Sequence, residues 1–454
     1  MNLKTLLQLV CCLLLVSLNF GCSNTKNKEA TTSTPNMVFI LSDDQAWSDY
    51  GFMGHPHIQT PAIDELAAEG RTFTRGYVTT PLCRPSLASI ITGLYPHLNG
   101  ITGNDPGLSY EGRRWSDGWK EERARLNKEF VKQFQQIPTL PVLLREKGYV
   151  SFQAGKWWEG SWKDGGFTDG MTYGDLAHGG RHGDEGLDIG RDGMQPVFNF
   201  MDSEQQKGQP FFLWYAPFMP HTPHTPPDSL LKKYLQKAPN EAEAKYWAMI
   251  EWFDFTVGQL LNYLEQKGLT ENTVVVYVCD NGWIQNPRPE TGKDFMPRSK
   301  QSPYDMGIRT PIIYKWPGHI SPKMDTSTFV SSLDMVPTVL QAVGLEPTPD
   351  MEGINVMDKA ALEKRTSIFS ADFSHDMTDI NHPAKSLESR IILKKPWKLI
   401  VPYDHNIIEA SVELYNIVED PFEQNNMAKQ HPEQVEALQS ALDQWWDPGH
   451  QQGL

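Results

Sequence analysis

The stretch NTVVVYVCDN, residues 272–281, contains an unbroken run of β-branched and aromatic residues that ends abruptly in polar side chains. A continuous apolar run of this kind is typical of a strand that is buried on both faces of a sheet. It directly follows a helix-like segment whose apolar residues recur every three or four positions, namely Ile250, Phe253, Val257, Leu260, Leu261 and Leu264. The order helix then buried strand predicts an α/β fold.

The same alternation continues along the chain from Asn36 onward. Further apolar runs predict strands at 37–41, 149–155, 210–218 and 310–316. Amphipathic patterns predict helices at 61–70, 138–148 and 333–344. We therefore expect a mostly parallel sheet sandwiched by helices, in a main domain covering residues 36–364.

The pattern changes at about Arg365. Residues 389–403 indicate a strand, a turn and a second strand, and residues 413–428 indicate another strand followed by a turn. Residues 431–446 have the pattern of an amphipathic helix. Residues 365–454 are thus predicted to form a small C-terminal α+β subdomain, an antiparallel sheet with one helix packed on the main domain.

The first residues have the features of an export signal. Lys4 precedes an apolar run from Leu6 to Leu18, which is short for a membrane span, and the run closes at Gly21-Cys22. This resembles a bacterial lipoprotein signal, with lipid on Cys22 and a flexible tether over residues 23–35. We expect an exported protein in the periplasm or outer membrane of a Gram-negative bacterium, attached to the membrane only through that lipid, with plain secretion as the alternative.

Composition limits the classes of partner. The chain has 454 residues, 39% hydrophobic and 21% charged, with a formal net charge of −15. Such a charge argues against nucleic acid or an anionic membrane surface as the main partner. An anionic ligand would need a local group of Lys, Arg, His or metal.

Two cysteines remain in the mature chain once Cys11, Cys12 and Cys22 are assigned to the signal and the lipid site: Cys83 and Cys279. An oxidising compartment would permit a disulfide between them. Cys83, however, lies in a turn between two prolines, beside an arginine and just ahead of a helix-like run beginning at Ser86. That is an unusual place for a structural thiol.

Polar side chains follow several predicted strands. Asp43 and Asp44 come after 37–41, and Asp280 and Asn281 come after 272–278. In open α/β sheets, ligands bind at the carboxyl ends of the strands. Oxygen ligands suit Ca²⁺ or Mg²⁺ rather than Zn²⁺ or copper. Either pair alone fits a helix cap or a turn equally well, but two pairs behind two buried strands favour a metal site.

Cationic or proton-carrying side chains follow other predicted strands and loops: Lys156, His221 and Lys300. Together with a divalent ion they would form a pocket for a tetrahedral oxyanion. Each of them taken singly is also compatible with a solvated surface group. His224 is either a further contact in this pocket or a residue that stiffens the Pro-rich loop.

Together with their neighbours in the sequence, these residues resemble the motifs of a family, the type I, formylglycine-dependent sulfatases of the alkaline phosphatase-like superfamily. The resemblance is carried by motifs in family order from residue 39 to residue 421: FILSDDQ, TPAIDELAAEG, CRPSLASIITGLYPH, GKWW, MPH, VCDNG, KQSPYDMGIRTP and ELYNIVEDP. The set is far more specific than any single motif. It implies an alkaline phosphatase-like fold.

The resemblance also implies roles. In that family, the Cys that matches Cys83 is oxidised by a modifying enzyme to formylglycine, whose hydrate attacks the sulfur of a sulfate ester. By the same matching, Ca²⁺, with Mg²⁺ less suited, is held by Asp43, Asp44, Asp280, Asn281 and modified Cys83. Lys156 matches a further catalytic residue of the family, the Lys of G-K-W-H, and His221 and Lys300 are expected to contact the sulfate and protonate the leaving oxygen.

Two positions depart from the family pattern. Leu87 stands where the family has an Arg, and Arg84 or Arg75 is a candidate substitute. Trp158 stands where the family has a His, and His178 or His182 is a candidate replacement imidazole. We accordingly expect substrate contacts from Arg84, His182, His224 and Trp158.

The leading interpretation is a sulfuric ester hydrolase acting on a sulfated carbohydrate. One alternative is a phosphonate monoester or phosphodiester hydrolase of the same superfamily, and another is a non-catalytic glycan-binding lipoprotein. Tryptophans near the motifs could stack on sugar rings, although ordinary packing also explains them: Trp47, Trp115, Trp119, Trp157, Trp158 and Trp162. Arg113 and Arg114 could meet further sulfates.

Overall fold

The computed structural model describes residues 34–108, 111–113, 116–403 and 411–449. The predicted signal and nearly all of the tether, together with Arg114 and Trp115, lie outside these ranges. Residues 35–454 cluster as one compact unit. Within the described ranges, no helix is both long enough and apolar enough to cross a membrane.

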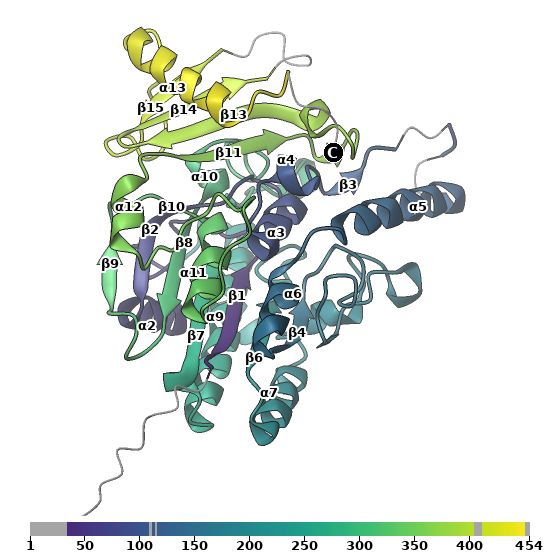
Figure 1. The fold of residues 1–454 in the computed structure, drawn as a ribbon. Helices are drawn as coiled ribbons and strands as arrows, with labels where there is room; N and C mark the ends of the chain where they lie inside the picture. The colour runs from purple at the N-terminus through teal and green to yellow at the C-terminus, as the bar shows by residue number, and fades with distance from the viewer. Residues whose placement is uncertain (1–33, 109–110, 114–115, 404–410, 450–454) are drawn as a thin grey trace, which may run out of the picture. The chain divides into compact units, whose positions relative to one another are not determined.

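The main sheet has nine strands (Figure 1). They are β1 (Asn36–Ser42), β2 (Arg71–Tyr77), β4 (Val150–Gly155), β5 (Asp169–Gly170), β6 (Phe211–Ala216), β7 (Thr273–Cys279), β8 (Arg309–Lys315), β9 (Lys323–Asp325) and β10 (Val330–Ser331). Their order is β10-β2-β8-β7-β1-β6-β4-β5, with β9 also paired to β2. Only β8 runs antiparallel to its neighbours among these pairings. The predicted mostly parallel sheet is confirmed.

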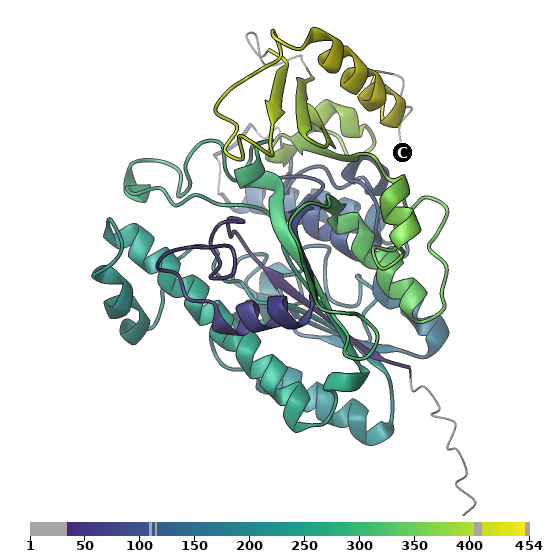
Figure 2. The same ribbon diagram turned by 90° about the vertical axis from the view of Figure 1, so that its left-hand side faces the viewer.

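Helices cover both faces of this sheet because side chains alternate along each strand. Phe39 and Val276 belong to one apolar core, whose helices are α3 (Cys83–Thr92), α6 (Leu140–Leu144) and α11 (Met335–Ala342). Ile40 and Tyr277 belong to the other core, whose helices are α2 (Pro61–Glu69), α7 (Gln195–Lys207) and α9 (Glu241–Gln266). Figure 2 shows the helices on either side of the sheet.

Several elements were not predicted from the sequence. They are the helices α4 (Pro96–Asn99), α5 (Asp117–Phe134), α7, α8 (Asp228–Leu235), α10 (Asp305–Ile308) and α12 (Lys359–Lys364), the strands β2, β5, β9 and β10 of the main sheet, and the paired short strands β3 (Asp105–Pro106) and β12 (Asp376–Met377). Helix α5 starts where the Ser116 side chain accepts a hydrogen bond from the Trp119 amide. Such a cap satisfies one of the unpaired amides of a helix start.

The C-terminal region is an antiparallel sheet of order β11-β13-β14-β15 with one helix. Its elements are β11 (Ile368–Phe373), β13 (Leu387–Lys394), β14 (Trp397–Pro402), β15 (Glu413–Asn416) and α13 (Pro432–Trp445). Leu438 and Leu442 of α13 pack on Ile392, Leu399 and Leu414 of the sheet. The sheet and helix are as predicted, except that β11 was missed. The boundary at residue 365 stays a prediction, because 35–454 form one compact unit.

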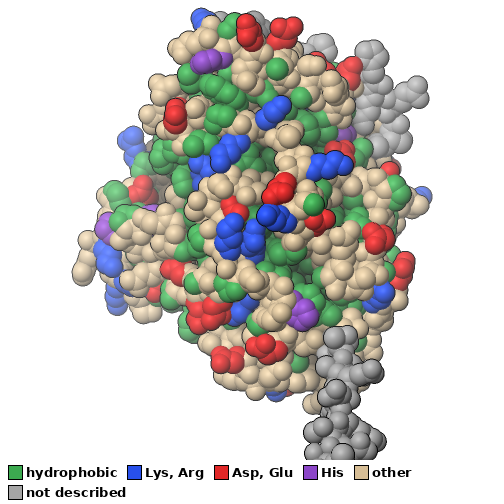
Figure 3. Space-filling view, turned by 60° about the vertical axis from the view of Figure 1, so that its left-hand side comes forward, with side chains coloured by type: hydrophobic (Ala, Val, Ile, Leu, Met, Phe, Trp, Pro, Cys, Tyr) green, Lys and Arg blue, Asp and Glu red, His purple; other side chains and the backbone are tan. Residues whose placement is uncertain are grey.

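Charge is unevenly distributed over the surface. On the face shown in Figure 3, Lys and Arg side chains gather in the upper and central parts, and acidic side chains are more frequent below them. A chain with a net charge of −15 therefore still presents locally cationic surface.

Candidate active site

The candidate site is built on the ends of two adjacent parallel strands. In the register of β1 and β7, Ser42 lies opposite Cys279, so Asp43 and Asp44 lie beside Asp280 and Asn281. The Asp44 amide donates to Asp280 Oδ1 at 3.2 Å, and Asn281 Nδ2 donates to Asp44 Oδ1 at 2.6 Å. Asp44 has φ +65°, a left-handed conformation that is strained for a non-glycine residue and is frequent at functional sites.

The next strand, β6, delivers His221. The amide of Asp43 donates to the carbonyl oxygen of Met219 at 3.1 Å, which ties the end of β1 to the segment that follows β6. His221 Nε2 lies 3.4 Å from Asp44 Oδ2. Its Nδ1 lies 2.6 Å from the carbonyl oxygen of Thr222, and because a carbonyl only accepts, Nδ1 carries the proton. Burial holds the pKa of His221 well below its usual range.

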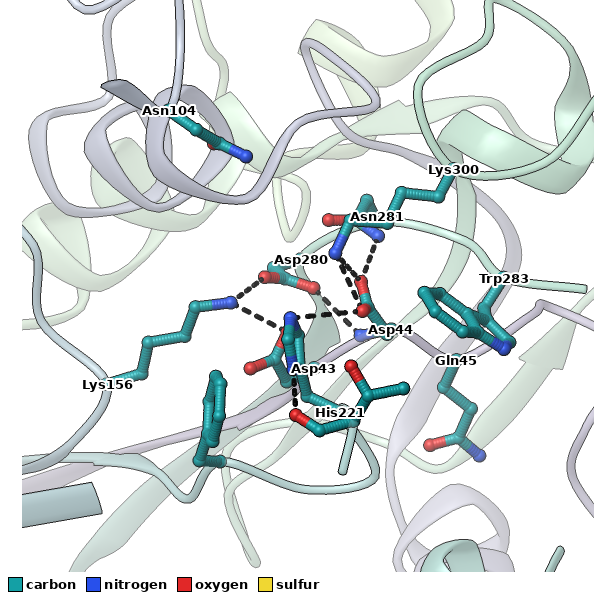
Figure 4. Close-up of polar contacts among 12 residues, drawn as sticks. Asp43, Asp44, Gln45, Asn104, Lys156, His221, Asp280, Asn281, Trp283 and Lys300 are labelled. Atoms are coloured by element: carbon teal, nitrogen blue, oxygen red, sulfur yellow. Dashed lines mark hydrogen bonds and ion pairs between the residues drawn. The ribbon is translucent and has the colours of Figure 1, made fainter. Parts of the chain in front are cut away.

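Two lysines enter the carboxylate group from opposite sides (Figure 4). Lys156 Nζ donates to Asp43 Oδ1 at 2.7 Å and to Asp280 Oδ2 at 3.1 Å. Lys300 Nζ donates to both oxygens of Asp44 at 2.7 Å. Burial disfavours the charged form of each lysine, but the facing aspartates outweigh it and raise both pKa values. Both lysines therefore stay protonated.

The lysines in turn shift the pKa values of the carboxylates. Burial disfavours the ionised form of Asp44, but the facing lysines, Lys300 above all, outweigh it and lower its pKa to about 2. For Asp43, burial dominates over the attraction of Lys156 and raises its pKa. The two neighbouring carboxylates thus differ in how strongly the site holds their negative charge.

The donor set fits a hard divalent cation. Ligand atoms of Asp43, Asp44, Cys83 and His221 lie within 4.8 Å of one another. Two buried oxygens, Asp43 Oδ2 and Asn281 Oδ1, have no hydrogen-bond partner. Three aspartates face only two lysines here, and unpartnered buried oxygens are costly unless a cation or a ligand meets them. Such oxygens are ligands for Ca²⁺ or Mg²⁺.

Cys83 is the first residue of α3 and is buried beside this group. Burial raises its pKa to about 12, against the opposing effect of Lys156 and Lys300. Cys83 and Cys279 are both free, so the alternative of a disulfide between them is wrong. Cys279 Sγ instead donates to the carbonyl oxygen of Asn281 at 3.1 Å. The helix begins at Cys83 rather than at Ser86, because proline is tolerated in a first turn.

Arg84 does not reach toward this site. Its guanidinium forms a two-pronged ion pair with Glu159 at 2.7 and 2.8 Å and donates to Asn127 at 2.8 Å, and the side chain is 1% exposed. The expectation that Arg84 contacts substrate is therefore corrected: its role is structural. Arg75 donates to the carbonyl oxygens of Thr326 and Ile417, and Leu87 is part of the core.

Trp158 lies beside the site. It is 6% exposed and packs in one apolar cluster with Cys83, Leu187 and Phe218. Lys156 Nζ lies 4.3 Å from the centre of a Trp158 ring, and the guanidinium carbon of Arg181 lies 4.4 Å from one. Arg181 was missed by sequence reasoning, which weighed only the histidines of the same Gly-rich segment.

The two candidate replacement imidazoles differ in position. His182 lies 5.7 Å from Trp158 between ring centres and lines the pocket at the site. His178 stacks on Tyr173 at 4.1 Å and pairs with Asp175 at 2.7 Å on the surface. The structure therefore favours His182 over His178.

A pocket of about 840 Å³ opens beside His221. Its lining includes His182, Phe218, His221 and His224, together with Glu241, Ala242, Lys245, Gln285, Pro287, Pro289, Glu290 and Asp294. Burial lowers the pKa of His224 to about 4, so this imidazole is neutral at pH 7. The pocket is large enough for a sugar-sized ligand.

Comparison with known proteins identifies the class. The Sulfatase family model matches residues 35–345, and a model of the C-terminal region of N-sulphoglucosamine sulphohydrolase matches residues 298–447. The chain belongs to the sulfatase family.

Individual relatives are more distant. The chain is 29% identical over 360 residues to N-acetylgalactosamine-6-sulfatase of Canis lupus familiaris, covering 71% of this chain and 65% of that relative's length. It is 23% identical to N-acetylgalactosamine-6-O-sulfatase of Bacteroides thetaiotaomicron, covering 94% of this chain and 96% of the relative. The crystal structure of Ps i-CgsB with k-i-k-neocarrahexaose shares the fold, with a TM-score of 0.70, 23% identity and coverage of 91% and 92%.

Proposed function

We propose that this protein is a sulfuric ester hydrolase that removes sulfate from a sulfated carbohydrate. The observation that carries the proposal is the convergence of Cys83 with strand-end carboxylates, whose ligand atoms lie within 4.8 Å of one another, beside two protonated lysines. This combination suits a doubly charged cation together with an anionic ester. The two buried oxygens without hydrogen-bond partners, Asp43 Oδ2 and Asn281 Oδ1, also favour a bound cation.

The cofactors belong to this proposal. Ca²⁺ would be held by Asp43, Asp44, Asp280 and Asn281 together with residue 83, which a modifying enzyme would convert from Cys to formylglycine. The ion supplies a Lewis acid for the oxygens of the ester. Mg²⁺ is less suited, because it demands near-ideal octahedral geometry and keeps several waters.

The chain's own residues bind and orient the ester. Lys156 and Lys300 provide two fixed positive charges in a buried setting, where charge interactions are stronger than in water. His221 is neutral, holds its proton on Nδ1 and presents Nε2 toward the carboxylates, so Nε2 is free to accept a proton. Lys300, which remains protonated, is the proton donor available to the leaving oxygen.

The carbohydrate substrate is supported by relatives whose names specify N-acetylgalactosamine 6-sulfate groups. Support also comes from the pocket of about 840 Å³ at the site.

Paired assays test the reaction type. Protein produced in a host that modifies sulfatase cysteines is offered an aryl sulfate and the matched aryl phosphonate, with Cys83→Ala as the inactive control. We expect hydrolysis of the sulfate and its loss in the control. Preference for the phosphonate would replace the proposal with a phosphonate monoester hydrolase. Absence of turnover, in protein shown to carry the modified residue, would favour a glycan-binding protein.

We also propose that the mature chain is exported and attached to a bacterial membrane by lipid on Cys22. The support is the apolar run, the Cys and the polar segment that follows it in the sequence. Fractionation of cells producing wild type and Cys22→Ala tests this. Retention of the variant in the membrane fraction would contradict it.

A further inference from the structure

A second cavity, of about 760 Å³, lies between helix α5 and two loop segments. One wall is the face of α5 from Trp119 to Gln135, and the other is formed by residues 160–164 and 173–182. The sequence patterns that identified the active site did not include this region.

The cavity is cationic in a protein whose net charge is −15. Its charged lining comprises Lys120, Arg123, Lys128, Lys132, Lys163 and Arg181 against Asp105, Asp164 and Asp175. Because positive charges outnumber negative ones two to one in the lining, the cavity attracts anions.

The three acids of the lining are already engaged. Asp105 pairs with both Arg123 and Arg181, Asp164 accepts from Gln135 at 2.7 Å, and Asp175 pairs with His178 at 2.7 Å. In the part of the chain that the structure describes, no ion pair is formed by Lys128 or Lys132. Their ammonium groups remain available to a ligand.

Aromatic rings lie beside these cations. The Arg123 guanidinium carbon is 5.2 Å from the centre of a Trp119 ring, and Lys163 Nζ is 5.1 Å from that of Trp162. Tyr173, on the opposite wall, is 39% exposed. Trp119 is buried, so the rings open to a ligand are those of Tyr173 and the partly buried Trp162. Such rings next to ammonium groups suit a ligand with an apolar face and an anionic edge, such as a sugar ring that carries a carboxylate or sulfate.

The cavity adjoins the active site. His182 lines both this cavity and the pocket beside His221. Arg181 also belongs to the cavity lining and contacts Trp158, which in turn contacts Lys156 of the carboxylate group. The two cavities therefore meet at His182, within reach of neighbouring residues of one carbohydrate chain.

We propose that this α5 cavity is a second sugar subsite that binds an anionic residue, a uronic acid or another sulfated sugar, next to the residue that is desulfated. The inference rests on the proposed function and specifies its substrate class: an anionic oligosaccharide rather than an isolated monosaccharide sulfate.

The test compares two substrates, N-acetylgalactosamine 6-sulfate alone and the same residue linked to a uronic acid. The measured quantity is the ratio of their kcat/KM values. We expect wild type to favour the disaccharide and the Lys128→Ala/Lys132→Ala double variant to reduce that preference by about tenfold, the effect expected of two partly exposed charge contacts. Both lysines are exposed on α5, so folding should be little affected.

Arg125→Ala is the matched control. Arg125 lies on the same helix and is also cationic, but it pairs with Glu122 and Glu129 and is not part of the cavity lining. The control should keep the preference of wild type. An equal reduction in the control and the double variant, or a double variant that keeps the full preference, would overturn the subsite.

A binding measurement separates the subsite from the proposed reaction. Calorimetry on Cys83→Ala with an unsulfated uronic-acid oligosaccharide needs no turnover. Binding that is weakened by the double substitution on α5 but not by Arg125→Ala supports the subsite, even if no sulfate ester is hydrolysed. Absence of binding, in a protein that hydrolyses aryl sulfate, would refute the subsite and leave the proposed function intact.

Discussion

Two of the buried charge clusters among the described residues differ in how completely their charges are paired. In the C-terminal cluster, Lys398 is 0% exposed and its Nζ lies 3.0 Å from Asp305 Oδ1 and 2.7 Å from Glu423 Oε1. Tyr77 donates to the other oxygen of Asp305 at 3.2 Å, and Arg309 lies 3.9 Å from it. Two acids thus face two cations, and Glu423 Oε1, which accepts no hydrogen bond of good geometry, is still balanced by the Lys398 ammonium at 2.7 Å.

The strand-end cluster has three aspartates against two lysines and leaves Asp43 Oδ2 and Asn281 Oδ1 unpartnered. A balanced cluster closes on itself and joins the C-terminal sheet to the segment that carries Lys300. The strand-end cluster is unbalanced and lies at the end of a parallel sheet, beside a pocket. It therefore needs a bound cation or ligand to satisfy its excess acceptors. The contrast indicates which buried charges hold the fold and which bind a ligand.

The largest expected change is the loss of stability caused by the Lys398→Met substitution. Removing one partner of a buried ion pair leaves the other charges uncompensated, so we expect the free energy of unfolding to fall by about 3–5 kcal/mol. Denaturant titration measures this change. The turnover number of the folded fraction should stay near that of wild type, and a stability change below about 1 kcal/mol would contradict a structural role.

Asp44→Asn should show the converse of Lys398→Met: activity should fall while the fold is kept. Losing a proposed cation ligand that also holds Lys300 should lower kcat/KM for an aryl sulfate by roughly a hundred- to a thousandfold. Steady-state kinetics on the modified enzyme provides the measurement, and circular dichroism checks the fold. Wild-type kcat/KM in this variant would remove Asp44 from the site.

The C-terminal cluster should also give a pH dependence. Burial, against the attraction of Lys398, raises the pKa of Glu423 to about 7. A carboxyl whose pKa is higher in the folded state binds more protons there, so the stability that Glu423 contributes falls as the pH rises from about 4.5 to about 7. Glu423→Gln should flatten the stability profile in this window. A steeper fall in the variant would show the opposite sign.

Calcium binding should distinguish the two clusters through the smallest of the expected changes, a shift in Tm. A cation that binds only the folded state stabilises it by about 2.7 kcal/mol at a hundred times its dissociation constant. Adding Ca²⁺ to chelator-treated protein should therefore raise the Tm of wild type and of Lys398→Met. The same addition should leave the Tm of Asp44→Asn nearly unchanged, and an equal rise in all three proteins would place the ion elsewhere.

Much of the site could be predicted because strand ends are readable from sequence. The apolar runs before Asp43 and Asp280 fix where each strand stops, and parallel pairing then brings those ends together. Arg84 could not be placed in the same way. Nothing in the sequence around Cys83 shows that the next residue on the helix faces Glu159 rather than the pocket.

Loop residues could not be predicted either, because their positions also depend on contacts between distant segments. Arg181 belongs to a Gly-rich segment without periodicity, and its contact with Trp158 depends on how distant loops pack. Strand β11, with the sequence IFSADF, has polar residues within a short run and was not distinguished from a loop. The C-terminal cluster was also invisible, because Asp305, Lys398 and Glu423 come together only through the packing of the two sheets.

The chemical state of residue 83 tests the central claim most directly. Protein isolated from its native host is digested, and the mass of the peptide that contains this residue is measured alongside the rate of aryl sulfate hydrolysis. We predict the mass of the formylglycine peptide, lower than that of the thiol form, in preparations that turn over the substrate. An intact thiol at position 83 in an actively hydrolysing preparation would contradict the account.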